Sequence, residues 1–167
     1  MITGKPEHLE TFDYLGPNRY FLTFCTFERR QIFLTRQHAD GVHEQFLRAA
    51  VDEGFAVLAY CFMPDHVHLL VEGQATDSDC RRFIARAKQL SGFHFQKVLG
   101  QRLWQRYGFE RTLRSDESTL AVARYILENP IRAGLAERVH DYPLLGSSAH
   151  SLDEILEAVQ LNARWSQ

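Results

Sequence analysis

The sequence predicts an α+β fold, and three observations support this prediction. Strand-like and helix-like segments follow one another in the order strand, helix, strand, strand, helix, strand. The two middle strands are separated only by Met63, Pro64 and Asp65, a turn short enough to make them an antiparallel hairpin. Two further helical segments follow the sixth element. The first six elements have the order of the ferredoxin-like split β-α-β unit, an antiparallel sheet with two packed helices, to which an added helix and a C-terminal helix are joined.

The first half of the chain contains three strands and one helix. Residues 20–27 are rich in aromatic and β-branched side chains, which predicts the first strand. Apolar residues recur at helical spacing over about 35–53, and Gly54 is placed to end this helix. Residues 54–62 and 66–71 are the two strands of the hairpin.

A long helix and the last strand come next. The helix-start signal at 77–79 leads into a helix that runs to about residue 99. Residues 100–114 are short mixed segments that predict the last strand and its approach. Trp104, in that approach, is expected to be a core aromatic rather than a base-stacking residue.

Two helices complete the chain. The first has Ser115 or Asp116 as its N-cap. It should loosen at Asn129, because the residue before a proline, here Pro130, disfavours the helical conformation. After a loop, residues 151–165 predict an amphipathic terminal helix.

The composition is that of one globular domain. The chain has 167 residues, of which 45% are hydrophobic and 24% charged, and this length is enough for one domain with a core. We take 1–167 as a single domain, with its core at about 17–148 and a helical extension at 149–167. The sequence has neither an apolar run near the ~20 residues of a membrane span nor an apolar signal segment. We therefore expect a cytoplasmic protein without a membrane partner, and its three cysteines to be reduced thiols.

The net charge of −2 conceals a strong asymmetry. The span 81–114 has nine basic residues and one acidic residue, a net of +8, and the rest of the chain has a net of −10. A solvated helix face usually mixes both signs, so this segregation favours a polyanionic partner such as nucleic acid. The predicted DNA-binding residues are Arg81, Arg82, Arg86, Lys88, Lys97, Arg102, Arg106, Arg111 and Arg114.

His66 and His68 are candidate metal ligands. Alternate residues of a strand share one face, so the two imidazoles project side by side while Val67 and Leu69 face the other way. A rigid strand that holds two imidazoles in this way is a bidentate metal platform. The pair could equally be two hydrogen-bonded histidines without a metal, and a third ligand is needed to decide.

Tyr125 and Asn129 are four residues apart on a predicted helix and share one of its faces. A tyrosine can act as a nucleophile and form a covalent intermediate. A carboxamide oxygen one turn away could complete the coordination of a hard divalent ion. From the spacing alone, Tyr125 could also be a packed helix aromatic, and Asn129 a helix cap.

Several segments resemble the HUH single-tyrosine transposases, and in particular their REP-associated tyrosine transposase branch, which is IS200-like. The first is the hairpin Phe-Met-Pro-Asp-His-Val-His-Leu-Leu-Val at 62–71. The second is Arg-Tyr-Ile-Leu-Glu-Asn-Pro-Ile-Arg-Ala-Gly-Leu at 124–135, and the others are Trp-Gln at 104–105 and the strand at 20–30. The likeness covers about residues 17–148, and the two longer motifs are jointly specific.

The resemblance implies a metal-dependent single-stranded DNA endonuclease and strand transferase, a nickase and ligase that cuts near hairpins. In this interpretation His66, His68 and Asn129 bind Mg²⁺ or Mn²⁺, and Tyr125 on the catalytic helix forms a 5′-phosphotyrosine and frees a 3′-hydroxyl. The implied partner is single-stranded DNA with imperfect hairpins, such as REP elements, and the implied state is a monomer or homodimer. Residues 107–112 depart from the family pattern, with Glu110 and Thr112 at positions where many relatives differ, and we assign them no role.

Two other functions remain open. One is a non-catalytic DNA-hairpin-binding protein of the same fold, although the joint presence of His66, His68, Tyr125 and Asn129 argues against it. The other is a metallohydrolase that uses water at the histidines, with Tyr125 as a structural residue. A covalent protein–DNA adduct would separate the three.

Overall fold

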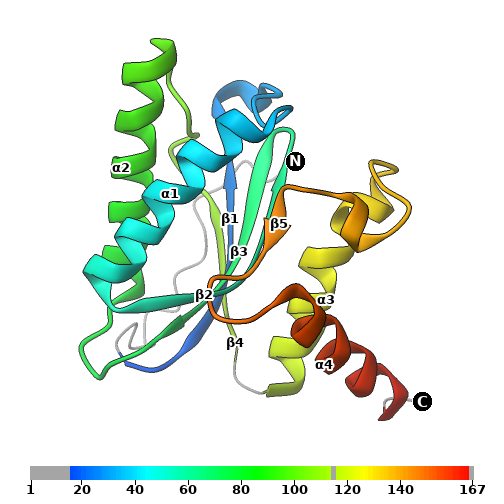
Figure 1. The fold of residues 1–167 in the computed structure, drawn as a ribbon. Helices are drawn as coiled ribbons and strands as arrows, with labels where there is room; N and C mark the ends of the chain where they lie inside the picture. The colour runs from blue at the N-terminus through cyan, green and yellow to red at the C-terminus, as the bar shows by residue number, and fades with distance from the viewer. Residues whose placement is uncertain (1–15, 114–115, 166–167) are drawn as a thin grey trace.

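The computed structural model describes residues 16–113 and 116–165, which form a five-stranded sheet and four α-helices (Figure 1). The sheet order is β4-β1-β3-β2-β5, and all neighbouring strands are antiparallel. The order of β1 to β4 is that of the ferredoxin-like unit, so the predicted fold class is confirmed. The strands are β1 (Arg19–Cys25), β2 (Phe55–Met63), β3 (His66–Gly73), β4 (Phe109–Leu113) and β5 (Leu145–Gly146), and the helices are α1 (Arg36–Glu53), α2 (Cys80–Leu99), α3 (Asp116–Arg132) and α4 (Leu152–Trp165).

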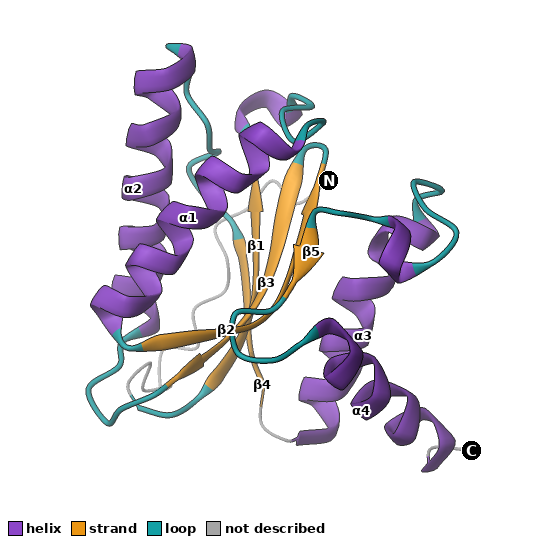
Figure 2. Cartoon of the chain, in the orientation of Figure 1, coloured by secondary structure: helices purple, strands orange, loops and turns teal. Residues whose placement is uncertain are grey.

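The sheet is covered on both faces. Helices α1 and α2 pack on one face, and α3 and α4 lie on the other (Figure 2). On β3, Val67 and Leu69 belong to the core under α1 and α2, whereas Leu70 packs with Ile126 and Leu127 of α3. Strand β3 therefore contributes alternate side chains to two separate layers.

Glycines and polar side chains fix the helix ends. Gly54 and Gly100 follow α1 and α2 with left-handed φ values of 72° and 67°, a conformation that a Cβ disfavours. The Asp79 carboxylate accepts a hydrogen bond from the first turn of α2 (2.9 Å). Helix α4 begins with a capping box, in which the side chains of Ser151 and Glu154 each accept a bond from the other's backbone N–H (3.2 and 2.8 Å).

Helix α3 is longer than the sequence predicts. It continues through Asn129 and Pro130 to Arg132, so the expected loosening at Asn129 is wrong. Pro130 removes one backbone donor. The following turn is nevertheless closed by a hydrogen bond from the Ala133 N–H to the Asn129 carbonyl (3.0 Å). The proline therefore costs the helix only the bond from its own nitrogen, and the helix continues past it.

Strand β1 is shorter than predicted. It ends at Cys25, and Phe27–Arg29 form a 3₁₀ turn in which Glu28 and Arg29 have positive φ values of 56° and 54°. Such a backbone is uncommon for residues with a Cβ and often marks a functional region. The turn brings the Arg29 side chain to Asp65, the turn residue of the hairpin that directly precedes His66.

Three smaller expectations concern the approach to β4, the start of α3 and the membrane. Trp104 is a core residue as predicted, since it is 5% exposed and its Nε1–H donates to the Ser91 hydroxyl (2.9 Å). Asp116 is the first residue of α3, and Ser115 lies outside the described residues. None of the described helices is long and apolar enough to cross a membrane.

Candidate active site

The two histidines share the face of β3 that points to α3, as the sequence predicts. Their ring centroids are 4.7 Å apart, whereas Val67 and Leu69 belong to the core on the opposite face. His68 is 6% exposed, and His66, the first residue of β3, is half-buried. The strand therefore presents two adjacent imidazoles, one deep and one accessible.

Each imidazole uses its Nδ1 atom within the protein. His68 Nδ1 is 2.8 Å from the hydroxyl of Thr23, which lies directly opposite His68 where β1 pairs with β3. His66 Nδ1 is 2.7 Å from an Asp65 carboxylate oxygen. These bonds orient both rings. The Asp65 carboxylate only accepts, so Nδ1 of His66 carries the proton, whereas the Thr23 hydroxyl can donate to or accept from Nδ1 of His68. Neither bond uses Nε2, an atom through which histidines bind metals.

The electrostatics of the pair suit metal binding. Burial lowers the pKa of His68 to about 3, and electrostatic interactions with His66, Arg132 and Arg29 act in the same direction. His68 is therefore neutral near pH 7, and the neutral imidazole is the form that binds a metal. Burial opposes ionisation of Asp65, but hydrogen bonds from His66 and Arg29 outweigh it and hold the pKa of this carboxyl below its usual range.

Tyr125 lies beside the histidines within the same chain. Its ring centroid is 5.8 Å from that of His68. Phe21 of β1 contacts both, with its ring centroid 5.4 Å from His68 and 5.9 Å from Tyr125. The Tyr125 side chain is nevertheless 47% exposed, so an external ligand can reach it. Helix α3 thus places an exposed phenol at the edge of the histidine pair.

Arg132 adds a positive charge to this cluster. Its guanidinium lies 4.2 Å from the centroid of the Tyr125 ring and donates a hydrogen bond to the Tyr125 backbone carbonyl. A cation over an aromatic face is attracted by the ring quadrupole. Arg132 therefore restrains the ring of Tyr125 and places a cation beside it.

Asn129 lies one turn after Tyr125 on α3 and is half-buried. The described contacts join its backbone carbonyl to Ala133 and do not join its carboxamide to the histidines. Within 16–113 and 116–165 there is also no cluster of three His, Cys, Asp or Glu side chains that could hold a metal. A metal bound by His66 and His68 would therefore need a third ligand of another type, and Asn129 stays a prediction for that role.

The predicted DNA-binding residues do not gather at the histidines. Those that the structure describes lie on α2, on the approach to β4 and on β4, and α2 covers the sheet face opposite α3. Arg82 and Arg86 form ion pairs with carboxylates of α1, both at 3.2 Å, and exposed pairs of this kind are weak. Arg114 lies outside the described residues. Their role in DNA binding stays a prediction.

Sequence reasoning missed three residues of this site. Asp65 was assigned only to the turn, although it directly precedes His66. Arg132 is seven residues after Tyr125, and this spacing of two helical turns could have placed both on one face. Thr23 reaches the site through the register in which β1 pairs with β3, and the predicted fold class alone does not give that register.

The two hydrogen bonds to Nδ1 lead to a first prediction. Asp65→Asn removes the charge that orients His66, and Thr23→Val removes the hydroxyl beside His68 without changing the shape of the side chain. Each is expected to lower Mn²⁺ affinity by roughly 10- to 100-fold, the usual effect of losing a residue that supports a metal ligand. Isothermal titration with Mn²⁺ measures this effect.

Asp52→Asn is the matched control for this prediction. Asp52 is also paired with an arginine, Arg86, but it lies on α1, which covers the other face of the sheet. It should leave Mn²⁺ affinity unchanged. If Asp65→Asn bound Mn²⁺ as tightly as the unmodified protein, the assigned orientation of His66 would be wrong.

Known proteins resemble this chain over most of its length. The family model described as "Transposase IS200 like" matches residues 18–129, a range that includes both histidines, Tyr125 and Asn129. The REP-associated tyrosine transposase of Escherichia coli K12 is 26% identical over 136 residues, which are 78% of this chain and 76% of that protein. A Haemophilus influenzae protein provisionally given the same name is 28% identical over 142 residues, with coverages of 78% and 80%.

A solved structure shares the fold. It is that of a REP-associated tyrosine transposase bound to a REP hairpin, with a TM-score of 0.68, 23% identity, and coverage of 83% of this chain and 82% of that one. The family match extends over more than half of the present sequence and agrees with the resemblance carried by its hairpin and α3 motifs. The chain belongs to the IS200-like transposase family.

Proposed function

We propose that this protein is a metal-dependent single-stranded DNA endonuclease and strand transferase that works through a 5′-phosphotyrosine intermediate. The observation that supports this most strongly is the contact of an exposed tyrosine, Tyr125, with a neutral, buried His68, at 5.8 Å between ring centroids. An accessible phenol next to two oriented imidazoles matches the needs of metal-assisted phosphoryl transfer. Membership of a transposase family supports DNA as the substrate.

The residues of the site fit a divalent ion. His66 and His68 would bind Mg²⁺ or Mn²⁺ through Nε2, since Nδ1 of each is held by Asp65 or Thr23, and Asn129 would add its carboxamide oxygen. When bound, such an ion polarises the scissile phosphate and offsets the charge that develops on it.

The remaining chemistry belongs to Tyr125. Its phenolic oxygen attacks the phosphorus atom and loses its proton, the new O–P bond joins the protein to the 5′ end, and the bond to the 3′ oxygen breaks. That oxygen takes up a proton and leaves as a 3′-hydroxyl. Attack by another 3′-hydroxyl reverses these steps and transfers the strand. Arg132 over the ring would limit the orientations that Tyr125 samples during attack.

The proposed substrate is single-stranded DNA that carries imperfect hairpins. The structural relative with a TM-score of 0.68 was solved bound to a REP hairpin, and the net charge of +8 over residues 81–114 favours a polyanion. Tyr125, exposed on α3 beside the histidines, is accessible to a flexible DNA strand, whereas a rigid duplex would have to be distorted to reach it.

A cleavage assay tests the proposal. A labelled REP hairpin with single-stranded flanks should be cut in Mg²⁺ or Mn²⁺ but not with EDTA, and the fully duplexed sequence should remain intact. Binding without any cutting would favour the non-catalytic hairpin binder. Metal-dependent cutting that leaves only free DNA ends, with no protein–DNA adduct, would favour a water-using metallohydrolase.

The role of Asn129 leads to a separate prediction. As a ligand, Asn129→Ala should weaken Mn²⁺ binding and cleavage together and leave the melting temperature without metal nearly unchanged. Asn129→Asp, which keeps an oxygen donor, should retain more activity than Asn129→Ala. Because α3 continues to Arg132, Asn129 does not cap it. If Asn129 has only a structural role inside the helix, Asn129→Ala should lower the melting temperature and leave Mn²⁺ affinity intact. Titration calorimetry and thermal unfolding of both variants distinguish the two roles.

A further inference from the structure

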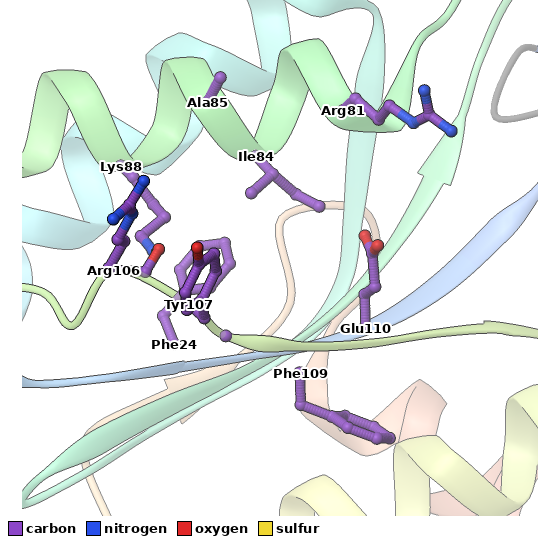
Figure 3. Close-up of a pocket in the computed structure, with 10 residues that line it drawn as sticks. Phe24, Arg81, Ile84, Ala85, Lys88, Arg106, Tyr107, Phe109 and Glu110 are labelled. Atoms are coloured by element: carbon purple, nitrogen blue, oxygen red, sulfur yellow. The ribbon is translucent and has the colours of Figure 1, made fainter. Parts of the chain in front are cut away.

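A cavity lies on the other side of the sheet from Tyr125, away from the candidate active site. It has a volume of about 370 Å³ and opens between α2 and the segment that leads into β4 (Figure 3). We call it the α2–β4 pocket and define it by Phe24, Ile84, Lys88, Arg106, Tyr107 and Glu110. Its size is within the usual range of small-ligand sites, and it lies in the part of the chain with a net charge of +8.

We propose that the α2–β4 pocket binds one unpaired nucleobase of the DNA strand, with the phosphates beside that base held at its basic rim. This inference rests on the proposed function, since it takes single-stranded DNA as the ligand. It assigns a binding role to Tyr107 and Glu110, for which the sequence alone indicated none.

Two contacts fix the wall of the pocket. The Lys88 ammonium donates to the carbonyls of Gln105 (2.9 Å) and Arg106 (3.2 Å), which ties α2 to the segment before β4. Gly108 lies so close to β1 that a Cβ would be 2.5 Å from the Thr23 carbonyl oxygen, so only glycine permits this approach. Between these two contacts, the backbone of Tyr107 is held in place while its side chain remains free to meet a ligand.

The side chains of the pocket suit a base. Tyr107 is 44% exposed, and the Arg106 guanidinium lies 5.3 Å from the centroid of its ring. Phe24 and Ile84 provide an apolar lining. Exposed aromatic rings and arginines in a basic groove are the groups on which proteins stack single-stranded bases. Trp104 cannot serve in this way because it is buried.

The carboxylate of Glu110 and the guanidinium of Arg106 suit different parts of a nucleotide, the base and its phosphates. Glu110 points to the α2 side of β4 (Figure 3), and a carboxylate there repels phosphate but can accept hydrogen bonds from base amino groups. Arg106 is exposed near Tyr107, and its guanidinium can pair with a phosphate. A base that enters the pocket would thus leave its phosphates at Arg106.

The pocket is close enough to β4 to position a strand for cleavage. Among the described residues, β4 pairs only with β1, so it is an outer strand of the sheet. Phe109 follows Tyr107 by two residues and points to the α3 side (Figure 3), where its ring centroid is 5.9 Å from that of Phe21. Phe21 in turn contacts His68 and Tyr125. A strand anchored in the pocket and folded over β4 would reach the tyrosine.

Binding of abasic DNA tests the inference. The probe is a REP hairpin with single-stranded flanks in which one flanking base at a time is removed, and affinity is measured by fluorescence anisotropy in EDTA, so that cleavage does not interfere. For the unmodified protein, loss of one particular base should weaken binding by about 5- to 150-fold, the effect of one base stack. Tyr107→Ala should weaken binding of the intact probe by a similar factor and show no further loss at that abasic position.

Three further variants complete the test. Tyr107→Phe keeps the ring and should behave like the unmodified protein. Arg106→Gln should weaken binding of all probes by the same factor, because phosphate contacts do not depend on the base. Phe93→Ala is the matched control, since Phe93 is a 66% exposed aromatic on α2 with Lys97 over its ring at 5.6 Å, outside the pocket. It should keep the profile of the unmodified protein.

Failure of the pocket can be distinguished from failure of the proposed function. If Tyr107→Ala binds the intact probe like the unmodified protein, or still loses affinity at the abasic position, the pocket does not bind that base, even if the DNA is cut. If the abasic profile depends on Tyr107 but no cleavage occurs with Mg²⁺ or Mn²⁺, the pocket is upheld and the proposed chemistry is wrong.

Discussion

His66→Ala and His68→Ala are each expected to lower Mn²⁺ affinity by more than ~100-fold, beyond the effect expected for the residues that merely support these ligands. Each variant removes one of the two Nε2 atoms that the fold orients toward the same side of β3. DNA cleavage should be lost with the metal, while binding of the hairpin probe in EDTA should persist. The two losses should occur together because the metal acts on the scissile phosphate.

The two variants differ in their effect on folding. His68 is 6% exposed and bonded to Thr23, so its replacement leaves a cavity and an unpaired hydroxyl. His66 is only half-buried, so His66→Ala should fold normally and gives the clearer result. Calorimetric titration with Mn²⁺, together with melting of the metal-free protein, separates lost ligation from lost stability.

His140→Ala is the matched control. His140 is also a histidine paired with an aspartate, since its Nε2 lies 2.8 Å from Asp153, but it is exposed and lies in the 3₁₀ turn Val139–Asp141. It should leave both Mn²⁺ affinity and cleavage unchanged. Unchanged Mn²⁺ binding in His66→Ala would mean that the histidine pair is a hydrogen-bonded structural feature and that the metal, if any, binds elsewhere.

The sequence predicted strands β1 to β4, the helices and the shared face of the two histidines because these depend on local periodicity. It missed β5, the two-residue strand Leu145–Gly146, which lies in the segment expected to be a loop. Alternation along β3 determines which side chains share a face of the sheet. Because Val67 and Leu69 are apolar, the face that they share is the one buried in the core. The continuation of α3 past Asn129 was not predicted. The expectation that a residue before a proline leaves the helical conformation considers only that one residue and not the turn that follows it. In the structure, the helix continues past Pro130 to Arg132.

The surroundings of the site were not predictable in the same way. Thr23 and His68 are far apart in sequence and meet through strand pairing, which local patterns do not reveal. The charge asymmetry indicated a polyanionic partner but not where the charges lie. The structure assigns most of them to α2 and β4, at a distance from the histidines along the sheet, and thereby separates the metal site from the α2–β4 pocket.

Tyr125→Phe is expected to abolish covalent attachment of DNA and to reduce cleavage by roughly 10⁴-fold or more, as removal of a nucleophile commonly does. The change deletes only the phenolic oxygen. The ring contacts with Phe21 and His68 and the cation contact with Arg132 do not involve that oxygen, so folding and DNA binding should be retained.

The most direct measurement is to identify by mass spectrometry the residue that carries DNA after reaction with a hairpin-flanked single strand. With Mg²⁺ or Mn²⁺ present, we expect one denaturation-resistant adduct, with the 5′ phosphate attached to the Tyr125 oxygen. EDTA, His66→Ala and Tyr125→Phe should each prevent it. An adduct on a different residue, or one of undiminished yield in Tyr125→Phe, would contradict the assignment of Tyr125 as the nucleophile.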